Sequence, residues 1–471
     1  ITAAISASKA GKATGPDRLG NDWYRDYSDL LVPILHILLN AWYSEGVFPP
    51  SFLEANIFCL KKSGNQHDAL NYRPLAERIH HNQNGFVPGR TIHETLHIFE
   101  AAQKTINEGG EQDDALVMLL DFMKAYDSLS RSFLLKTLRR HGYPAKLIEA
   151  VRLLHDGTTV SFMANGFTSR KVNVTSGIRQ GCPLAPLLFI LALDPLYREL
   201  ERDTGMKGVF LRSEGGEVEV RVAGYADDTA VYLDSAAQVV AMLAITDAFG
   251  AASGLQLNHH KTLVIALRRN GPTHVICLPP PLKWLTSDQY GRYLGIQVGS
   301  RSDPEPTWHK TIQQLEARLF IASQKTTTVE QRSLIASAVI IPKLTYIGQH
   351  AWPSTRTMNL VGKKIKNYVW HGCFATEING SRAWLDADLA ALPRTDGGLA
   401  VPDLRIELMA MAATAVAKWS FGGRVEHIVG DILMADKALQ SIPAIFLNTN
   451  AVAVPSTRFR EETQCGQLGR R

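Results

Sequence analysis

The chain has 471 residues, of which 45% are hydrophobic and 20% charged, an ordinary globular composition that can supply a large core. Its net charge of +5, from 50 basic and 45 acidic residues, is too small to identify a nucleic-acid partner by itself. No secretory signal is visible and no apolar run reaches the ~18 residues that a bilayer requires. By length we expect about two to four domains or subdomains. Because the chain begins at Ile1 in mid-pattern, we also expect it to be a piece of a longer polypeptide.

The cysteines are few and irregularly spaced. Their number is odd and none are paired at the spacing of zinc ligands, which predicts reduced intracellular thiols. They are Cys59, Cys182, Cys277, Cys373 and Cys465.

Hydrophobic periodicity predicts a mixed α/β front portion followed by a helical middle. The expected front elements, in chain order, are a helix over 28–45, a strand over 56–62, a buried strand over 115–120, and helices over 131–141, 183–201 and 236–253. Pro183 and Pro186 suit the first turn of their helix, and Gly254 suits the end of the last one. Further helices are expected over 308–322, 330–371 and 404–420, with a loop over 393–403 and a poorly specified tail.

The stretch VRVAGYADDTAVYL, residues 220–233, carries two adjacent carboxylates, Asp227 and Asp228. Alternating valines, from Val218 onward, precede the pair and apolar residues follow it, which predicts a sheet hairpin with the acids at its turn. Two like charges 4 Å apart repel by about 4 kcal/mol at an effective dielectric of 20. A bound Mg²⁺ or Mn²⁺ would compensate them. A solvated turn is the alternative for the pair alone.

A third acid has the same placement, because Asp121 directly follows the apolar strand 115–120. If that strand lies beside the hairpin, Asp121 meets Asp227 and Asp228 at one end of the sheet. Three such carboxylates can hold two metal ions ~3.5–4 Å apart, the arrangement of nucleotidyl transfer. In the segment TSGIRQGCPLAPLLF, Gln180 and Gly181 could face a nucleotide, although an ordinary helix N-terminus would look the same.

Several stretches resemble the reverse transcriptases of non-LTR (LINE-type) retrotransposons. They are KATGPDRLGNDWY, NYRPL, NQNGFVPGRTIHET, LDFMKAYDSLSRSFL, SGIRQGCPLAPLLF, GYADDT, GLQLNHHKT, RYLGI, IPKLTYIG and DGGLAVPDL. Their ordered set spans roughly residues 9–420. The resemblance implies an α+β right-hand polymerase fold, with an antiparallel palm sheet and a helical thumb. It implies fingers over 1–110, a palm over 111–300, a thumb and post-thumb region over 301–421, and a tail over 422–471.

The resemblance also implies roles for matching residues. Asp121, Asp227 and Asp228 would bind two Mg²⁺ ions, with Mn²⁺ as a substitute. Tyr126 would exclude a 2′-hydroxyl, and Lys261 would protonate pyrophosphate. The other implied contacts are Phe122 at the triphosphate, Gln180 and Gly181 at nucleotide and template, and the primer-grip turn Tyr293, Leu294 and Gly295. Lys61 and Arg73 could meet phosphate oxygens, or they could belong to a solvated strand end.

The stretch HETLH, residues 93–97, matches the zinc-helix pattern HExxH, with His93 and His97 on one helix face and Glu94 as a possible base. No third ligand is evident from the sequence. We expect Ile92, Leu96 and Phe99 to form the buried stripe of this helix, with the histidines flanking it.

The expected partners are an RNA template, a DNA primer and dNTPs, without a membrane, and the oligomeric state is left open. The family resemblance implies a nuclear location. Only a few residues separate Leu75 from Gln83, where the family has a few tens, so the fingers are expected to be shortened. This favours an alternative, a decayed element that binds nucleic acid without polymerising. A group II intron-type maturase is a further alternative, against which the stretch GGLAVPDL argues.

Overall fold

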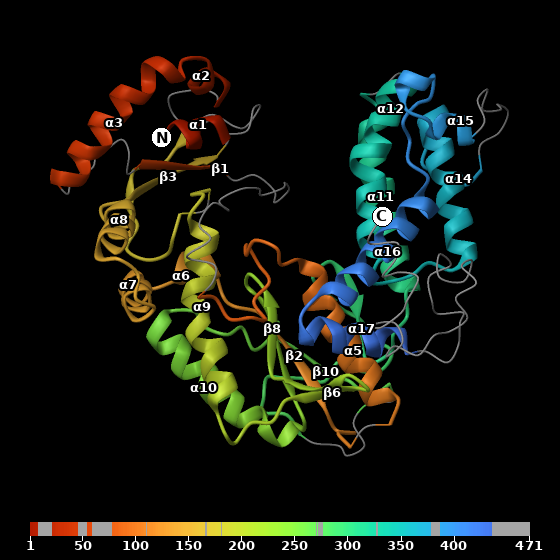
Figure 1. Cartoon of the computed structure of the whole chain (residues 1–471), viewed down its shortest axis with the longest axis horizontal. Coiled ribbons are helices and arrows are strands. Elements are labelled where there is room, and N and C mark those ends of the chain that lie inside the picture. Colours follow the sequence, from red (N-terminus) through yellow and green to blue (C-terminus); the bar gives the residue numbers. More distant parts are fainter. Residues whose placement is uncertain are drawn as a thin grey trace. The chain divides into compact units, whose positions relative to one another are not determined.

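The structure is a computed structural model (Figure 1) that describes residues 1–7, 21–45, 54–58, 78–109, 111–164, 167–179, 181–269, 271, 277–325, 328–377 and 387–435. Contacts divide the chain into two compact units built from discontinuous segments. Unit 1 comprises residues 1–80, 122–196 and 246–256, and unit 2 comprises 81–121, 197–245 and 257–471. Helices and antiparallel sheet occur together, which confirms the expected α+β class. The expected boundaries of fingers, palm and thumb stay predictions.

Unit 1 combines helices with a small mixed sheet. Its helices include α1 (Thr2–Ala7), α2 (Asn21–Asp26), α3 (Ser28–Glu45), α6 (Ala125–Ser128), α7 (Arg131–Arg140) and α8 (Ala145–His155). In the sheet, β3 (Thr159–Ala164) pairs in parallel with β1 (Glu54–Phe58) and antiparallel with β4 (Phe167–Thr168) and β5 (Val172–Asn173). The helix α7 begins where the Ser130 hydroxyl accepts a hydrogen bond from Phe133 N, and it buries Leu134 and Leu138.

Two long apolar helices, α9 (Ala185–Arg202) and α10 (Val239–Ser253), follow the expected ranges closely. By length and composition, the stretch Ala236–Ser253 is apolar enough to cross a membrane, and 39% of it is buried in the fold. The expectation that no run of this length exists was therefore wrong. Val239 and Met242 are completely buried, as in the core helix of a globular protein.

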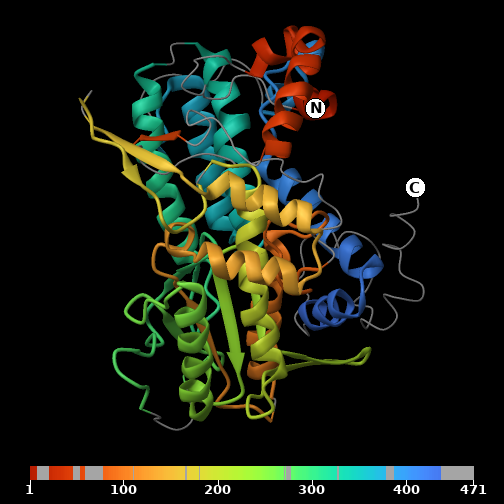
Figure 2. The same cartoon turned by 90° about the vertical axis from the view of Figure 1, so that its left-hand side faces the viewer.

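The central sheet of unit 2 is antiparallel, in the order β10 (Leu263–Ala266), β2 (Leu116–Leu120), β9 (Asp228–Leu233), β8 (Val222–Tyr225). All residues of β2 are buried, which explains its uninterrupted apolar sequence. The alternating valines before the acids do not form one strand. Val218 and Val220 lie in β7 (Gly216–Val220), which pairs with β6 (Val209–Ser213) as a separate ribbon visible in Figure 2, and only Val222 belongs to β8.

Helices complete unit 2. They are α5 (Ile92–Asn107), α11 (Glu305–Ser323), α12 (Val329–Ile335), α13 (Ile341–Gly348), α14 (Thr355–His371), α15 (Ala387–Ala391), α16 (Leu404–Phe421) and α17 (Arg424–Met434), with a π-helical turn over Ala336–Ile340. A short hairpin joins β11 (Gly291–Tyr293) to β12 (Ile296–Val298). The helix expected over 330–371 is interrupted over 349–354, where Pro353 stands. The sequence analysis missed α17, which buries Ile428, Val429 and Ile432.

One hydrophobic core holds unit 2 together. It joins Phe99 of α5, Tyr232 of β9 and Trp308 of α11 with apolar residues of α13 and α14. The Trp308 indole also donates a hydrogen bond to the carbonyl of Ala351, at 2.7 Å, so its polar atom is satisfied inside the core. The sheet edge and the helices around it therefore share one core.

We expect replacement of Gly224 in β8 by alanine to destabilise the protein. A Cβ at this position would lie 2.1 Å from the Tyr197 hydroxyl and 2.7 Å from the backbone oxygen of Asp228, so the sheet must shift. Overpacking of this kind costs about 1–3 kcal/mol. Thermal and urea unfolding of Gly224→Ala measure the loss.

Gly362→Ala is the matched control, because a Cβ at Gly362 of α14 meets no atom within 4 Å. This control should be neutral or slightly stabilised by the higher helix propensity of alanine. Equal stability of the two variants would contradict the close contact at Gly224.

Candidate functional site

The strand register brings Asp121 and Asp228 to one edge of the sheet. Leu120 of β2 pairs with Thr229 of β9 in an antiparallel ladder, so the next step of the register sets Asp121 opposite Asp228. Asp228 also pairs with Tyr225 across the β8–β9 hairpin, and Asp227 lies in the turn between them. Asp227 and Asp228 are exposed, whereas Asp121 is partly buried. The candidate acids therefore occupy one solvent-facing edge.

The carboxylate oxygens of Asp121, Asp227 and Asp228 are not close enough together to bind one ion without side-chain adjustment. The groups of described residues whose ligand atoms lie within 4.8 Å of one another do not include this trio. The donor chemistry nevertheless fits a hard divalent cation, which prefers carboxylate oxygens.

The loop before β10 fixes the backbone of Asp121. Asn258 donates its N–H to the Asp121 carbonyl at 2.7 Å, and the Lys261 N–H closes the turn on Asn258 at 3.1 Å. Because Leu263 pairs with Leu119, continuing that register places Lys261 beside Asp121. The Lys261 side chain is exposed there. A cation and the acids thus share one edge.

The hairpin turn has a strained backbone that one buried glutamine supports. Ala226 has φ +58°, a left-handed conformation that alanine adopts at a cost. The Gln83 amide oxygen accepts a hydrogen bond from Ala226 N at 2.8 Å, and the Gln83 amide nitrogen donates to the Ala226 carbonyl at 3.1 Å. Gln83 is 1% exposed, so water does not compete for these bonds. The side chain clamps both polar groups of the residue that precedes Asp227.

Neighbours of Gln83 pair with β8 in the manner of an extra strand. Asn84 N donates to the Gly224 carbonyl at 2.8 Å, and Gly224 N donates to the Asn82 carbonyl at 2.9 Å. Thr95 of α5 donates its hydroxyl proton to the same Gly224 carbonyl at 3.2 Å. The NQNG segment therefore forms the outer support of the acidic hairpin, a role that the sequence analysis missed.

Three tyrosine hydroxyls lie close enough to Asp228 for its charge to affect them. The Tyr197 hydroxyl lies 3.0 Å from the Thr229 hydroxyl and accepts a hydrogen bond from Gln83 at 3.1 Å. Burial raises the pKa of Tyr197, Tyr293 and Tyr346, and the negative charge of Asp228 raises each further. These phenols stay neutral at physiological pH and add no charge to the acidic edge.

The expected primer-grip turn is a strained turn with basic surroundings. Leu294 and Gly295 have φ +46° and +89°, and Tyr293 is buried. The Tyr346 hydroxyl donates a hydrogen bond to the Leu294 carbonyl. Residues that line a pocket beside the turn include Arg292, Lys310 and Lys343.

Three expected contact residues are described in unit 1. Phe122 is buried, and the Tyr126 ring stacks on Phe189 with centroids 4.6 Å apart. Gly181, with φ +94°, is exposed. Lys61, Arg73 and Gln180 lie outside the described residues, as does the upstream part of the shortened connection, up to residue 77.

Gly177 and Ile178 pack on the backbone of Tyr126. A Cβ on Gly177 would lie 2.7 Å from the carbonyl oxygens of Tyr126 and Asp127, and Ile178 donates its N–H to the Tyr126 carbonyl at 2.9 Å. Only glycine permits this approach, which explains the glycine at position 177.

The HETLH helix departs from expectation. His97 does not flank the buried stripe but belongs to it, at 8% exposure. Glu100, three residues further along α5, and His350, far away in the sequence, each place a ligand atom within 4.8 Å of His97 and of each other. Glu94, the possible base, is paired with Lys418. Burial lowers the pKa of His97 and His350 to about 3 and raises that of Glu100 to about 8, so without an ion this cluster is neutral near pH 7.

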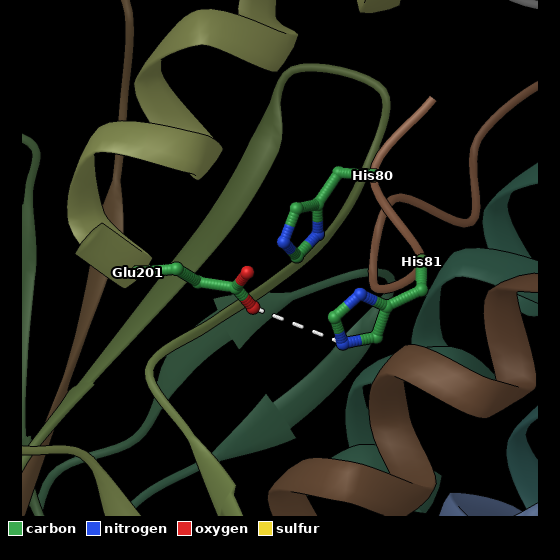
Figure 3. A group of neighbouring side chains, drawn as sticks. All are labelled: His80, His81 and Glu201. Atoms are coloured by element: carbon green, nitrogen blue, oxygen red, sulfur yellow. Dashed lines mark ion pairs between the residues drawn. The ribbon is translucent and has the colours of Figure 1, made fainter. Parts of the chain in front are cut away.

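Another histidine lies on the surface of unit 2. His81 Nε2 lies 3.8 Å from a carboxylate oxygen of Glu201, and Figure 3 marks this pair with a dashed line. The His81 side chain is exposed and that of Glu201 is about one third exposed, at 35%. His80, also drawn there, donates its backbone N–H to Asp194 within unit 1, at 2.8 Å. An exposed pair of this kind contributes little to stability.

Residues 65–298 match the family described as reverse transcriptase (RNA-dependent DNA polymerase). The chain is 21% identical to the transposon TX1 uncharacterized 149 kDa protein of Xenopus laevis, over 87% of this chain and 32% of that protein. It is 28% identical to the Pol polyprotein of the R2 retrotransposable element of Popillia japonica, over 61% of this chain and 40% of that protein. The chain thus spans about a third to two fifths of these curated relatives.

Solved telomerase structures also resemble the chain. The telomerase of Candida tropicalis in complex with a fragment of telomeric RNA has a TM-score of 0.33 and 11% identity, over 93% of this chain and 57% of that one. Together with the acids at one sheet edge, the family match identifies the domain. Residues 65–298 form a reverse transcriptase domain of the non-LTR retrotransposon type.

Proposed function

We propose that this chain is an RNA-directed DNA polymerase that extends a DNA primer along an RNA template with dNTPs. Divalent metal ions and a nucleic-acid template are general to the family. The observation that carries the proposal is the register that sets Asp121 opposite Asp228, with Asp227 in the adjoining turn. In the reaction the primer 3′-hydroxyl oxygen bonds to the α-phosphorus of the dNTP, the bond to the β-phosphate oxygen breaks, and pyrophosphate leaves.

The three carboxylates would hold two Mg²⁺ ions. When bound, such a pair lowers the pKa of the attacking hydroxyl and stabilises the leaving pyrophosphate. The protein's own part is to keep the carboxylates at one edge, which the Gln83 clamp and the Asn258 hydrogen bond support. Lys261, exposed at that edge, would give a proton to pyrophosphate.

Three residues of unit 1 would have the roles that the family resemblance implies for them. Tyr126 would exclude the 2′-hydroxyl of a ribonucleotide, and the stack on Phe189 restricts the motion of its ring. Gly181 is exposed and has no side chain to obstruct a nucleotide. Phe122, which is buried, would contribute through its backbone.

The primer backbone would lie along the basic side of the turn Tyr293–Leu294–Gly295. Arg292 and Lys343 line the adjacent pocket, and burial with the nearby charges of Arg292 and Arg318 lowers the pKa of Lys343. In the part of the chain that the structure describes, no carboxylate pairs with Arg292, Arg318 or Lys343. A phosphate would relieve their mutual repulsion.

The wider role would be the copying of a retrotransposon, with the nucleus as its location. The shortened connection before Gln83 favours a second candidate, a decayed copy that binds nucleic acid without extending a primer. The two candidates agree on binding and differ on catalysis, so a catalytic assay separates them.

The deciding experiment is primer extension with purified protein, an RNA template, dNTPs and Mg²⁺. Asp227→Asn and Asp228→Asn should each reduce extension to the level seen without enzyme, because each removes a charged metal ligand. Asp288→Asn, which changes an exposed turn carboxylate, is the control and should extend normally. A wild-type protein that binds the template and primer but extends nothing would establish the decayed copy instead.

Because Gln83 positions the turn that carries the acids, its loss should lower the turnover rate and leave dNTP binding largely unchanged. Gln83→Met keeps the size of the side chain and removes all its hydrogen bonds, which leaves buried groups of Ala226 unpaired at about 1–3 kcal/mol. We expect kcat to fall at least tenfold, about 1.4 kcal/mol at the barrier, with KM for dNTP little changed.

Gln103→Met, which removes a buried hydrogen bond to Gly299, is the control for general destabilisation. If both variants lose stability and keep kcat, the clamp does not position the acids. Steady-state kinetics and thermal unfolding, measured on the same preparations, separate the two effects.

If Lys343 contacts a phosphate, its removal should change how the affinity for template–primer depends on salt. Lys343→Ala should reduce the slope of log Kd against log salt by about one, since one phosphate contact is lost. Arg212→Ala is the control of equal charge change, because Glu111 and Glu217 already neutralise Arg212. Fluorescence anisotropy of a labelled template–primer over a salt series measures both slopes, and identical slopes would place Lys343 away from the nucleic acid.

A further inference from the structure

Four side chains of unit 2, three from α5 and one from the segment after α13, form a cluster that does not include the candidate catalytic acids. His93, His97 and Glu100 project from one face of α5, and His350 stands in the segment after α13. His350 Nδ1 lies 2.8 Å from a Glu100 carboxylate oxygen, and His350 Nε2 lies 2.7 Å from His93 Nδ1. The His97 and His350 rings have centroids 5.0 Å apart. Both imidazole nitrogens of His350 thus point at other ligating groups.

Two imidazoles of the cluster are buried, and the other two side chains are partly buried. The His350 side chain is completely buried and His97 is 8% exposed. Glu100 pairs with no lysine or arginine among the described residues, although two lysines, Lys104 and Lys418, bind other glutamates nearby. The His97 ring makes no hydrogen bond within the described part of the chain. The Glu100 side chain is 28% exposed and has His350 as its partner, so the imidazole of His97 is the buried polar group that lacks a hydrogen bond among the described residues.

We propose that His97, Glu100 and His350 bind a transition-metal ion of the zinc class. Their ligand atoms lie within 4.8 Å of one another. Ligands at the 2.0–2.2 Å distances of zinc are separated by about 3.3 Å in a tetrahedral site, so rotamer adjustments of side chains suffice to close the set. Imidazole and carboxylate are donors that zinc accepts together, and the set leaves one position for water.

His93 would hold His350 in place. With Nδ1 of His350 on the ion, its Nε2–H donates to His93 Nδ1, which fixes the tautomer and the ring plane. His93 and His97 also line a cavity of about 380 Å³ between α5, α16 and α17, which supplies an access route for the ion. The ligand set differs from that of the HExxH metalloproteases, because Glu94 is paired with Lys418 and the third ligand follows α13.

The ion would join two supports of the candidate catalytic edge. The helix α5 carries Thr95, which donates to Gly224 of β8. The chain before His350 carries Tyr346, which donates to Leu294. A bond network through Glu100 and His350 therefore connects residues 250 positions apart. Ion binding at this site does not depend on polymerase activity, so its test does not require an active polymerase.

Co²⁺ is the probe, because it replaces zinc and absorbs visible light in a tetrahedral nitrogen and oxygen site. Chelator-treated protein is titrated with Co²⁺ in excess Mg²⁺, which occupies the hard carboxylate site. The wild type should bind one Co²⁺ with a visible band that Zn²⁺ abolishes. His350→Ala and His97→Gln should lose the band, and His93→Phe should bind about 10- to 100-fold more weakly.

His309→Ala, which removes an exposed histidine of α11, is the control and should behave as the wild type. Zn²⁺ should raise the Tm of the wild type and of this control but not that of His97→Gln, whose folding is checked by circular dichroism. The proposal is overturned if the wild type shows no tetrahedral Co²⁺ band, or if His97→Gln binds Co²⁺ as tightly as the wild type.

Discussion

The left-handed turn at Ala226 is the constraint on which the candidate catalytic edge depends. A two-residue turn sets Asp227 beside Asp228, and it requires a backbone conformation that alanine does not favour. Gln83 offsets that cost by bonding both polar groups of Ala226 from inside the protein. Gly224 allows the Tyr197 hydroxyl to pass close to the strand, and Tyr197 in turn bonds Gln83. Asp227 and Asp228 are exposed, but Gln83 and Ala226, which position their turn, are buried.

The supports of this edge come from segments far apart in the chain. The NQNG segment pairs with β8, the loop after α10 bonds the Asp121 carbonyl, and α5 reaches Gly224 through Thr95. The same α5 contributes to the core shared with α11, α13 and α14. Polymerase chemistry needs carboxylates held within a fraction of an ångström, and such a network of short, buried contacts provides that rigidity.

Sequence patterns predicted what depends on near neighbours. The burial of β2 and the acid that ends it follow from a continuous apolar run, and the helices α3, α7 and α16 follow from periodicity. The patterns did not predict contacts made across long separations. Gln83 meets Ala226 over 143 residues, and His350 meets Glu100 over 250, with no local signal for either. His97 was misplaced because the buried stripe of α5 is wider than its aliphatic residues suggest, since α16 and Trp419 cover the histidine side as well.

Because of the β2–β9 register, the number of residues in β2 before Asp121 matters as much as the presence of the aspartates. Side chains alternate between sheet faces, so removal of one residue between Leu116 and Leu120 would turn Asp121 to the opposite face or unpair the buried ladder. All three aspartates would still be found in such a sequence. A mobile element leaves many copies behind. A copy that keeps both the three acids and the length of the apolar strand before Asp121 is therefore better marked as a working polymerase than one identified by the acids alone.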